Sequence, residues 1–155
     1  MQVLLVTDQP SQHEQVMIAY LRAGFQITAT SSVKVAETFI RCSAIDLLIL
    51  AESLDSKLTH SLALLAEHQN PLLATILLTD RTGEAAEEVF DLIPSVHCAV
   101  GSTVAGKTIL QLGRASIESL AGQGMAFSFQ RHSKSAGGRV ASGGADSTLE
   151  MADAA

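Results

Sequence analysis

The chain has 155 residues, 47% hydrophobic and 17% charged, which suits one domain with a sizeable core. A net charge of -6 argues against binding nucleic-acid phosphates, which normally requires a basic surface. The two cysteines, Cys42 and Cys98, have no paired spacing and favour a reducing compartment over a disulfide framework. No apolar run approaches the ~20 residues of a membrane helix, and no signal-peptide pattern follows Met1. These features predict a soluble, cytoplasmic protein without a nucleic-acid or membrane partner.

The first part of the chain alternates between apolar strands and amphipathic helices. Residues 3–6 predict a buried strand, and Ser11 with Glu14 matches a capping box at the start of a helix that Gly24 ends. Residues 25–30 alternate as a strand does. Ser31 or Ser32 is expected to cap the next helix, whose inward residues would be Val35, Ala36, Phe39 and Ile40.

The second part repeats this alternation around a central apolar run. Residues 45–52 read as a strand buried on both faces, with its carboxyl end at Ala51. Further strands are predicted over 72–79 and 96–100, and a last helix from Ser102 to about Leu120. The intervening helices are predicted from two apolar sets, which are Leu54, Leu58, Leu62 and Leu65, and then Ala86, Val89, Phe90 and Ile93 before Pro94.

Five strands alternating with five helices indicate an α/β fold built of parallel, right-handed βαβ units. The expected fold is a doubly wound five-stranded parallel sheet in the flavodoxin-like order 2-1-3-4-5, with helices on both faces. One domain is expected over residues 1–121. Residues 122–155 are rich in Gly, Ala and Ser, and are expected to form a disordered tail.

Three stretches share a family pattern: LRAGF at 21–25, IDLLIL at 45–50 and ILLT at 76–79. With the order of the elements, they make residues 2–121 resemble the CheY-like receiver domain of bacterial two-component response regulators. The resemblance implies an acidic pair after the first strand, a phosphoacceptor aspartate ending the third, a hydroxyl ending the fourth and a lysine ending the fifth. A carboxylate nucleophile needs a divalent cation held by acids, and a lysine and hydroxyl that meet the phosphoryl oxygens.

This chain departs from that set at its centre. The phosphoacceptor position, five residues after Asp46, is Ala51, which cannot act as a nucleophile. One acid of the pair remains as Asp8, the hydroxyl is Thr79, and the lysine position falls at Gly101. The resemblance therefore implies a degenerate pseudo-receiver that is not an enzyme and has no catalytic residue.

The remaining polar residues are predicted to be structural, and no metal or cofactor is expected. Asp8, Glu52 and Asp80 could together hold Mg²⁺ weakly, but solvated acids or helix caps are the favoured interpretation. Glu52 is expected to point to the opposite face from Ala51, and Asp55 to cap the next helix. The histidines His13, His60 and His68 are expected at the surface, and Cys42 between helices.

One motif suggests a different function. Residues 101–108 satisfy G-x-x-x-x-G-K-[ST] between a strand and a helix, the pattern of a phosphate-binding loop, through Gly101, Gly106, Lys107 and Thr108. It follows the fifth strand, no later strand supplies a magnesium-binding aspartate, and a helix from Ser102 would already contain Gly106. Nucleotide or phosphate binding is therefore the alternative function.

The favoured function is a signalling module that works by protein contact. Receivers commonly bind partners or dimerise through their fourth helix, fifth strand and fifth helix. The predicted fifth helix has two apolar stripes, more than one packing face can bury, unless the tail folds over them. A protein partner or a second copy is expected at this face, with the candidate residues Val89, Leu110, Ile117 and Leu120.

Overall fold

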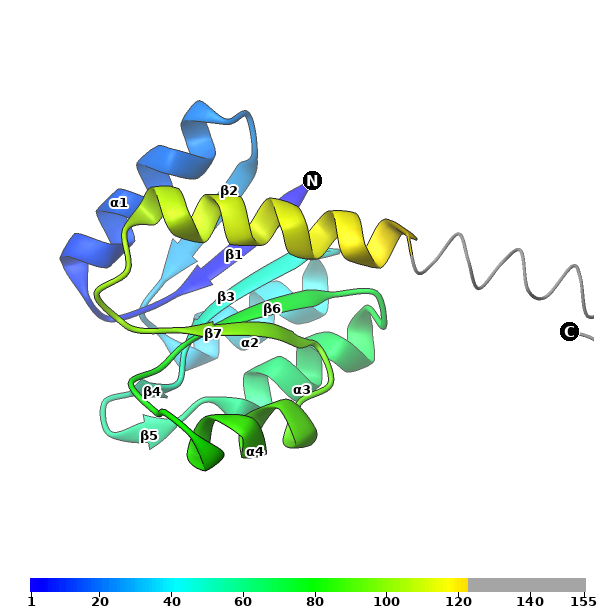
Figure 1. The fold of residues 1–155 in the computed structure, drawn as a ribbon. Coiled ribbons are helices and arrows are strands. Elements are labelled where there is room, and N and C mark those ends of the chain that lie inside the picture. The colour runs from blue at the N-terminus through cyan, green and yellow to red at the C-terminus, as the bar shows by residue number, and fades with distance from the viewer. Residues whose placement is uncertain (123–155) are drawn as a thin grey trace, which may run out of the picture. The chain divides into compact units, whose positions relative to one another are not determined.

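The computed structural model describes residues 1–122 and contains a sheet of five parallel strands (Figure 1). Its order is β2-β1-β3-β6-β7, which confirms the predicted doubly wound arrangement. The strands β4 and β5 form a separate hairpin, so their labels interrupt the numbering. The sheet strands are β1 Gln2–Val6, β2 Gln26–Thr30, β3 Leu47–Ala51, β6 Ala74–Leu78 and β7 Val96–Val100.

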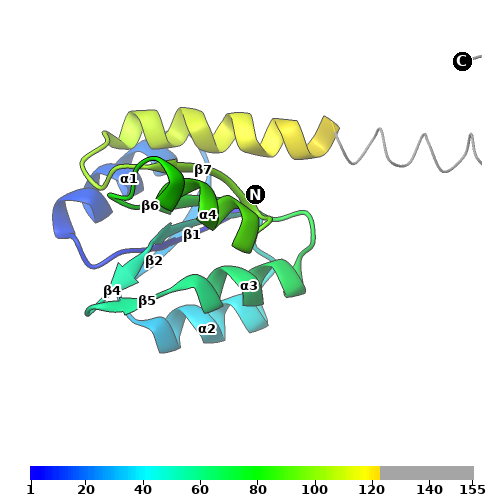
Figure 2. The same ribbon diagram turned by 60° about the horizontal axis from the view of Figure 1, so that its bottom comes forward.

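Helices cover both faces of the sheet (Figure 2). α1 (Pro10–Arg22) and a last helix over residues 106–122 pack on one face. α2 (Val33–Cys42), α3 (His60–Gln69) and α4 (Glu84–Leu92) pack on the other. No helix of the described residues is both long and apolar enough to cross a lipid bilayer.

The central strand β3 joins the two halves of the core. Leu48 and Leu50 contribute to the cluster beneath α2, α3 and α4, whereas Leu47 and Ile49 contribute to the cluster beneath α1 and the last helix. All four are fully buried. Successive side chains of a strand point to opposite faces, so a continuous apolar run serves a sheet covered on both sides.

Two predictions about helix ends are confirmed, whereas one about a helix end and one about an inward-facing residue are wrong. Gly24 has a φ of 88° just after α1, and the Ser32 hydroxyl accepts a hydrogen bond from Val35 N at 3.3 Å. The capping box at Ser11 is wrong, because Pro10 begins α1 and Ser11 already lies in its first turn. Val35 is 54% exposed instead of inward, since the inward face consists of the buried Ala36 and Ile40 and the half-buried Phe39.

The predicted start of the third helix is also wrong. Ser53–Leu54 (β4) and Lys57–Leu58 (β5) form an antiparallel hairpin before α3. The turn residues Asp55 and Ser56 have φ values of 51° and 64°, the left-handed values of a tight hairpin turn, so Asp55 is not a helix cap. Leu54 is buried but Leu58 is 59% exposed, because Leu58 pairs with Ser53 and Leu54 with Lys57, and neighbouring pairs of a hairpin point to opposite faces.

The last helix begins later than predicted. Residues 101–105 form a loop, within which Val104 N donates to Gly101 O at 3.2 Å, and the helix starts at Gly106. It includes Gly122, the first residue assigned to the predicted tail. The rest of that predicted tail lies outside the described residues.

Candidate functional site

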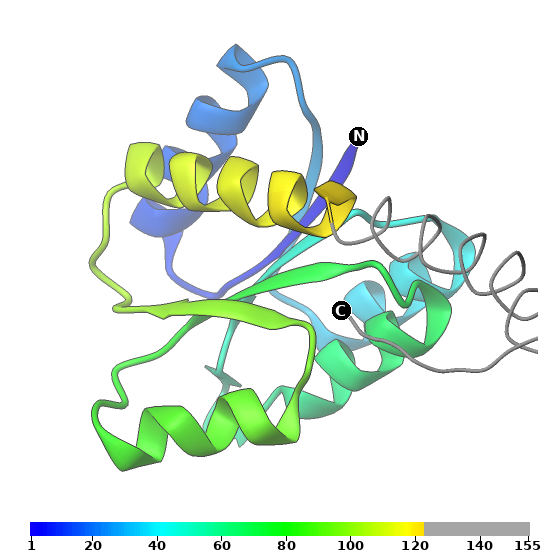
Figure 3. The ribbon, with the colours of Figure 1, turned by 45° about the vertical axis from the view of Figure 1, so that its right-hand side comes forward.

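The four positions of the receiver pattern lie at one edge of the sheet. The parallel register pairs Val6 with Leu50 and Ala51 with Leu78, so the chain leaves β1, β3 and β6 at the same edge (Figure 3). Thr79 N donates to Val100 O at 2.8 Å, which places the end of β7 beside them. Carboxyl ends of parallel strands are where open α/β sheets bind ligands.

Hydrogen bonds fix the backbone of Ala51 and Glu52 at the centre of this edge. The Thr59 hydroxyl donates to Ala51 O at 2.5 Å and lies 3.0 Å from Glu52 O. Thr59 N also donates to Glu52 O at 2.9 Å, and Glu52 N donates to Leu78 O at 2.9 Å. Because Thr59 immediately precedes α3, these bonds tie the end of β3 to the start of that helix.

A buried carboxylate network lies next to Ala51. Glu52 is only 8% exposed, and its Oε1 accepts a hydrogen bond from the Thr79 hydroxyl. Its Oε2 lies 3.0 Å from His60 Nε2 and 2.7 Å from Arg81 Nε. The Thr79 oxygen in turn accepts from Arg81 N at 3.1 Å. The network therefore connects the ends of β3 and β6, the start of α3 and the loop before α4.

These neighbours keep the Glu52 carboxylate ionised. Burial alone would raise the pKa of Glu52, but hydrogen bonds from Thr79 and His60, followed by the Arg81 guanidinium, lower it below its ordinary value. Charge-assisted hydrogen bonds of this type are about twice as strong as neutral ones. Glu52 thus acts as a fixed negative charge at the sheet edge.

The predictions for Glu52 and His60 are therefore wrong. Glu52 is a buried ion-pair partner instead of a solvated acid, and His60 contacts it instead of lying free at the surface. The two residues are separated by the hairpin, which bends the chain back toward the end of β3. Sequence spacing does not reveal that the chain turns back here. A glutamate directly after a buried apolar strand is nevertheless a signal that could have identified Glu52 as a candidate site residue.

The other two acids do not join Glu52. Asp8 is exposed, whereas Asp80 Oδ1 accepts from the Ser102 hydroxyl at 3.1 Å and holds the loop after β7. Across residues 1–122, no three side chains of His, Cys, Asp or Glu are grouped to hold a metal ion. Asp8, Glu52 and Asp80 are therefore not grouped as the ligands of a cation.

The phosphate-loop motif has a packing explanation at Gly106. A Cβ added there would lie 2.5 Å from Gln15 O in α1, so glycine lets the two helices approach closely. In the loop before Gly106, Ser102 O accepts a hydrogen bond from Gln12 Nε2 at 2.7 Å, and the Ser102 hydroxyl donates to Asp80. A phosphate bound in this loop would be repelled by the Asp80 carboxylate. The predicted helix start at Ser102, which weighed against the motif, is wrong. The helix starts at Gly106 itself and leaves Lys107 and Thr108 exposed in its first turn.

ATP is expected to leave the melting temperature of the wild-type protein unchanged, because the Asp80 carboxylate accepts a hydrogen bond from Ser102 in the loop that would hold the phosphates and would repel them. The measurement is a thermal melt with and without ATP and Mg²⁺, in parallel for the Lys107→Ala variant. A ligand that binds the folded state raises the melting temperature by mass action. A rise that Lys107→Ala abolishes would support nucleotide binding instead.

The structure changes the set of candidate contact residues. Val89 is fully buried on the core side of α4 and is unavailable for an interface, so that assignment is wrong. Leu110 lines a groove beside α1 and therefore lies on the side away from α4. Ile117 and Leu120 are half-buried against the core. The exposed large apolar residues of α4 are Phe90 and Leu92, which are 39% and 63% exposed.

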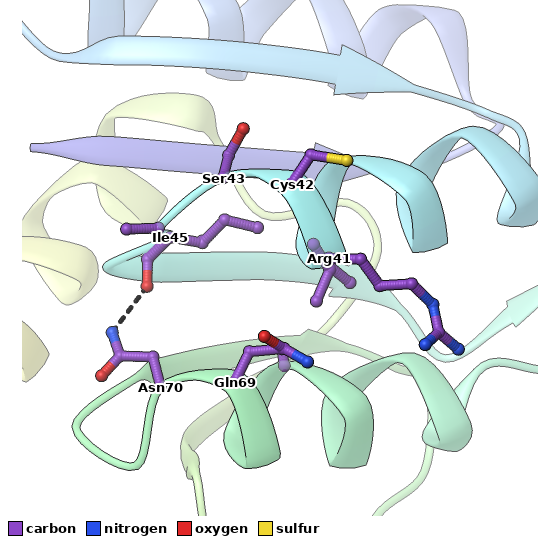
Figure 4. Close-up of a pocket in the computed structure, with 9 residues that line it drawn as sticks. Arg41, Cys42, Ser43, Ile45, Gln69 and Asn70 are labelled. Atoms are coloured by element: carbon purple, nitrogen blue, oxygen red, sulfur yellow. Dashed lines mark hydrogen bonds between the residues drawn. The ribbon is translucent and has the colours of Figure 1, made fainter.

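A hollow of about 450 Å³ opens at the opposite edge of the sheet, between the ends of α2 and α3 (Figure 4). Asn70 Nδ2 donates to Ile45 O across it at 2.8 Å. Cys42 lies exposed at its rim, so the prediction that this cysteine packs between helices is wrong. The hollow lies at the amino ends of the strands, away from the Glu52 network.

No family model matches the sequence. No curated protein matches it significantly either. The arrangement of strands, helices and carboxyl-end loops instead has its counterparts among solved structures. These counterparts are receiver domains of response regulators, and the chain has their fold.

Three of the similar structures illustrate the likeness. The receiver domain of a LuxO repressor protein from Vibrio parahaemolyticus has a TM-score of 0.70 and 14% identity, covering 81% of this chain and 95% of that one. A CheY-like receiver from Methanospirillum hungatei has a TM-score of 0.68 and 14% identity, covering 79% and 97%. A receiver protein from Sinorhizobium medicae has a TM-score of 0.68 and 15% identity, covering 77% and 96%. At these identities the likeness defines the fold and not the activity.

Proposed function

We propose that the protein is a cytoplasmic, receiver-type signalling module that works by protein contact and independently of phosphorylation. The single observation that carries the proposal is the position of Ala51 next to the hydrogen-bonded and ion-paired Glu52. Ala51 has no nucleophilic group at the acceptor position, and the neighbouring Glu52 uses the Thr79 hydroxyl as a hydrogen-bond donor. The proposed module performs no catalytic step.

The network supports this proposal on chemical grounds. An acyl phosphate forms when a carboxylate oxygen attacks phosphorus, and an alanine methyl group has no lone pair for that attack. Glu52 is a carboxylate, but both of its oxygens accept hydrogen bonds and it is nearly buried. By the receiver resemblance, Thr79 is the hydroxyl that would meet a phosphoryl oxygen. Here that hydroxyl is bonded to Glu52 instead.

The surface supports a role in protein contact. Phe90 and Leu92 expose apolar side chains on α4, next to the edge strand β7. The proposed contact face therefore consists of α4, β7 and the half-buried side chains of the last helix. Apolar surface rimmed by charge is typical of protein interaction sites.

Acetyl phosphate with Mg²⁺ is expected to add no phosphoryl group to this protein. The measurement is intact mass, with an active receiver domain treated in parallel as the positive control. A hydroxylamine-labile increase of one phosphoryl mass would contradict the proposal. The Glu52→Gln variant would then show whether Glu52 is the acceptor.

A further inference from the structure

α4 has an acidic stripe along one side. Glu84, Glu87, Glu88 and Asp91 follow the i, i+3, i+4, i+7 spacing of a single helix face, and all four are exposed. Within residues 1–122, the only ion pairs are those of Glu52, so none of these four carboxylates has a cationic partner among the described residues. Like charges at i, i+4 destabilise a helix, which makes an external cationic partner favourable.

The groove beside α1 is lined by apolar and basic side chains, which complement the acidic and apolar surface of α4. It encloses about 500 Å³ between α1 and the start of the last helix, and its walls include the apolar Ile18, Ala19 and Leu110. Arg22 and Lys107 also line it, both are exposed, and none of its lining residues is acidic. Ile18 is 42% exposed, so apolar surface remains open to a partner.

We propose that α4 of one copy docks in this groove of a second copy. The acidic stripe would meet Arg22 and Lys107, while Phe90 or Leu92 would meet Ile18 and Leu110. α4 packs on one face of the sheet and the groove lies on the other, so α4 cannot fill the groove of its own chain. The contact is therefore head-to-tail, and such contacts build rings or open chains of copies.

This inference rests on the proposed function in one respect, because it uses α4 as a contact surface and names a second copy as the partner. It does not depend on the phosphorylation result. A phosphorylated protein that associates would refute only the phosphorylation-independent function. An unphosphorylated protein that stays monomeric would refute only the head-to-tail contact.

The first test is sedimentation velocity of the full chain over a range of concentrations at low ionic strength. The average mass is expected to rise above twice the monomer mass, because a head-to-tail dimer still has a free groove and a free α4 that can bind further copies until a ring closes. Association is expected to weaken strongly at about 1 M salt, where the Debye length falls to about 3 Å. A wild-type protein that is monomeric throughout would overturn the proposal.

The second test uses charge reversal on each surface separately. The groove variant Arg22→Glu with Lys107→Glu should be monomeric, as should the helix variant Glu87→Lys with Asp91→Lys. An equimolar mixture should regain association, because each variant then presents the charge that the other lacks. The control variant Lys34→Glu with Arg41→Glu changes the net charge as much as the groove variant does, but at exposed positions of α2. It should associate like the wild type.

Circular dichroism on each sample establishes that the variants are folded. Association of either double variant alone, at the wild-type strength, would overturn the proposal. A monomeric mixture of two folded variants would do the same. An assembly that stops at a dimer at every concentration would also refute it, since it would indicate a symmetric contact instead.

Discussion

Gly106→Ala is expected to destabilise the protein by about 1–3 kcal/mol, the usual cost of overpacking a close contact. The added Cβ would lie 2.5 Å from Gln15 O and 2.7 Å from Gln15 C, both of which are backbone atoms of α1. A flexible side chain could rotate away, but a backbone carbonyl in a helix cannot. The last helix would therefore have to move off α1, loosening the packing above Val16 and Ile109.

Helix propensity alone predicts the opposite sign, because alanine is favoured over glycine by about 1 kcal/mol inside a helix. The steric cost is expected to exceed that gain. Chemical denaturation of both proteins measures the difference. Gly101→Ala is the matched control, since a Cβ at Gly101 has no atom within 4 Å and should change stability little. Equal stability of the Gly106→Ala variant would contradict the prediction, because the steric cost would then be no larger than the gain in helix propensity.

Glu52→Gln is expected to destabilise the protein by about 2 kcal/mol at neutral pH, the order of a hydrogen bond to a charged group. Glutamine has one acceptor oxygen where the carboxylate has two, so Thr79, His60 and Arg81 cannot all keep their present bonds. The Arg81 side chain is 34% exposed and can turn to water, which limits the loss. Urea unfolding gives the free energy for each protein.

The cost of Glu52→Gln should depend on pH. The folded protein holds the pKa of Glu52 below its ordinary value, so the unfolded chain takes up a proton first as the pH falls. The stabilisation is therefore complete above the unfolded pKa, and is lost as the pH falls through the lower, folded pKa. The difference between wild type and variant should shrink over that acidic range and stay constant at neutral pH.

Glu14→Gln is the control for this pH series, because Glu14 is exposed on α1. Its stability should match the wild type at every pH. A Glu52→Gln variant whose deficit is unchanged on acidification would indicate that lost packing, and not lost charge, explains the effect. A variant as stable as the wild type at neutral pH would show that the network contributes nothing to folding.

Part of the candidate site could be predicted from sequence. The position of Ala51 follows from its distance to Asp46 within an apolar strand, and Thr79 follows from the end of the next sheet strand. Both sit at the carboxyl edge, because parallel strands leave all such ends on one side. Strand periodicity and loop position are local properties, so they can be read along the chain.

The contacts of Glu52 could not be predicted in this way. His60 reaches it only because the hairpin at Asp55 and Ser56 turns the chain back before α3. Arg81 reaches it only because β3 and β6 are neighbours in the sheet. The strand order could be predicted, but the hairpin turn and the directions of the side chains that meet at Glu52 could not, because no spacing in the sequence encodes them.

The sequence by itself determined the alternating elements, the parallel sheet and the place of Ala51 at the end of a buried strand. The tertiary structure alone decided that Glu52 is buried among Thr79, His60 and Arg81, that Gly106 serves helix packing, and that Val89 faces the core. The physical reason is that the spacing of apolar residues indicates only the type of one element and which of its faces is buried. The neighbours of a side chain depend instead on which elements the chain brings together, and at what distance.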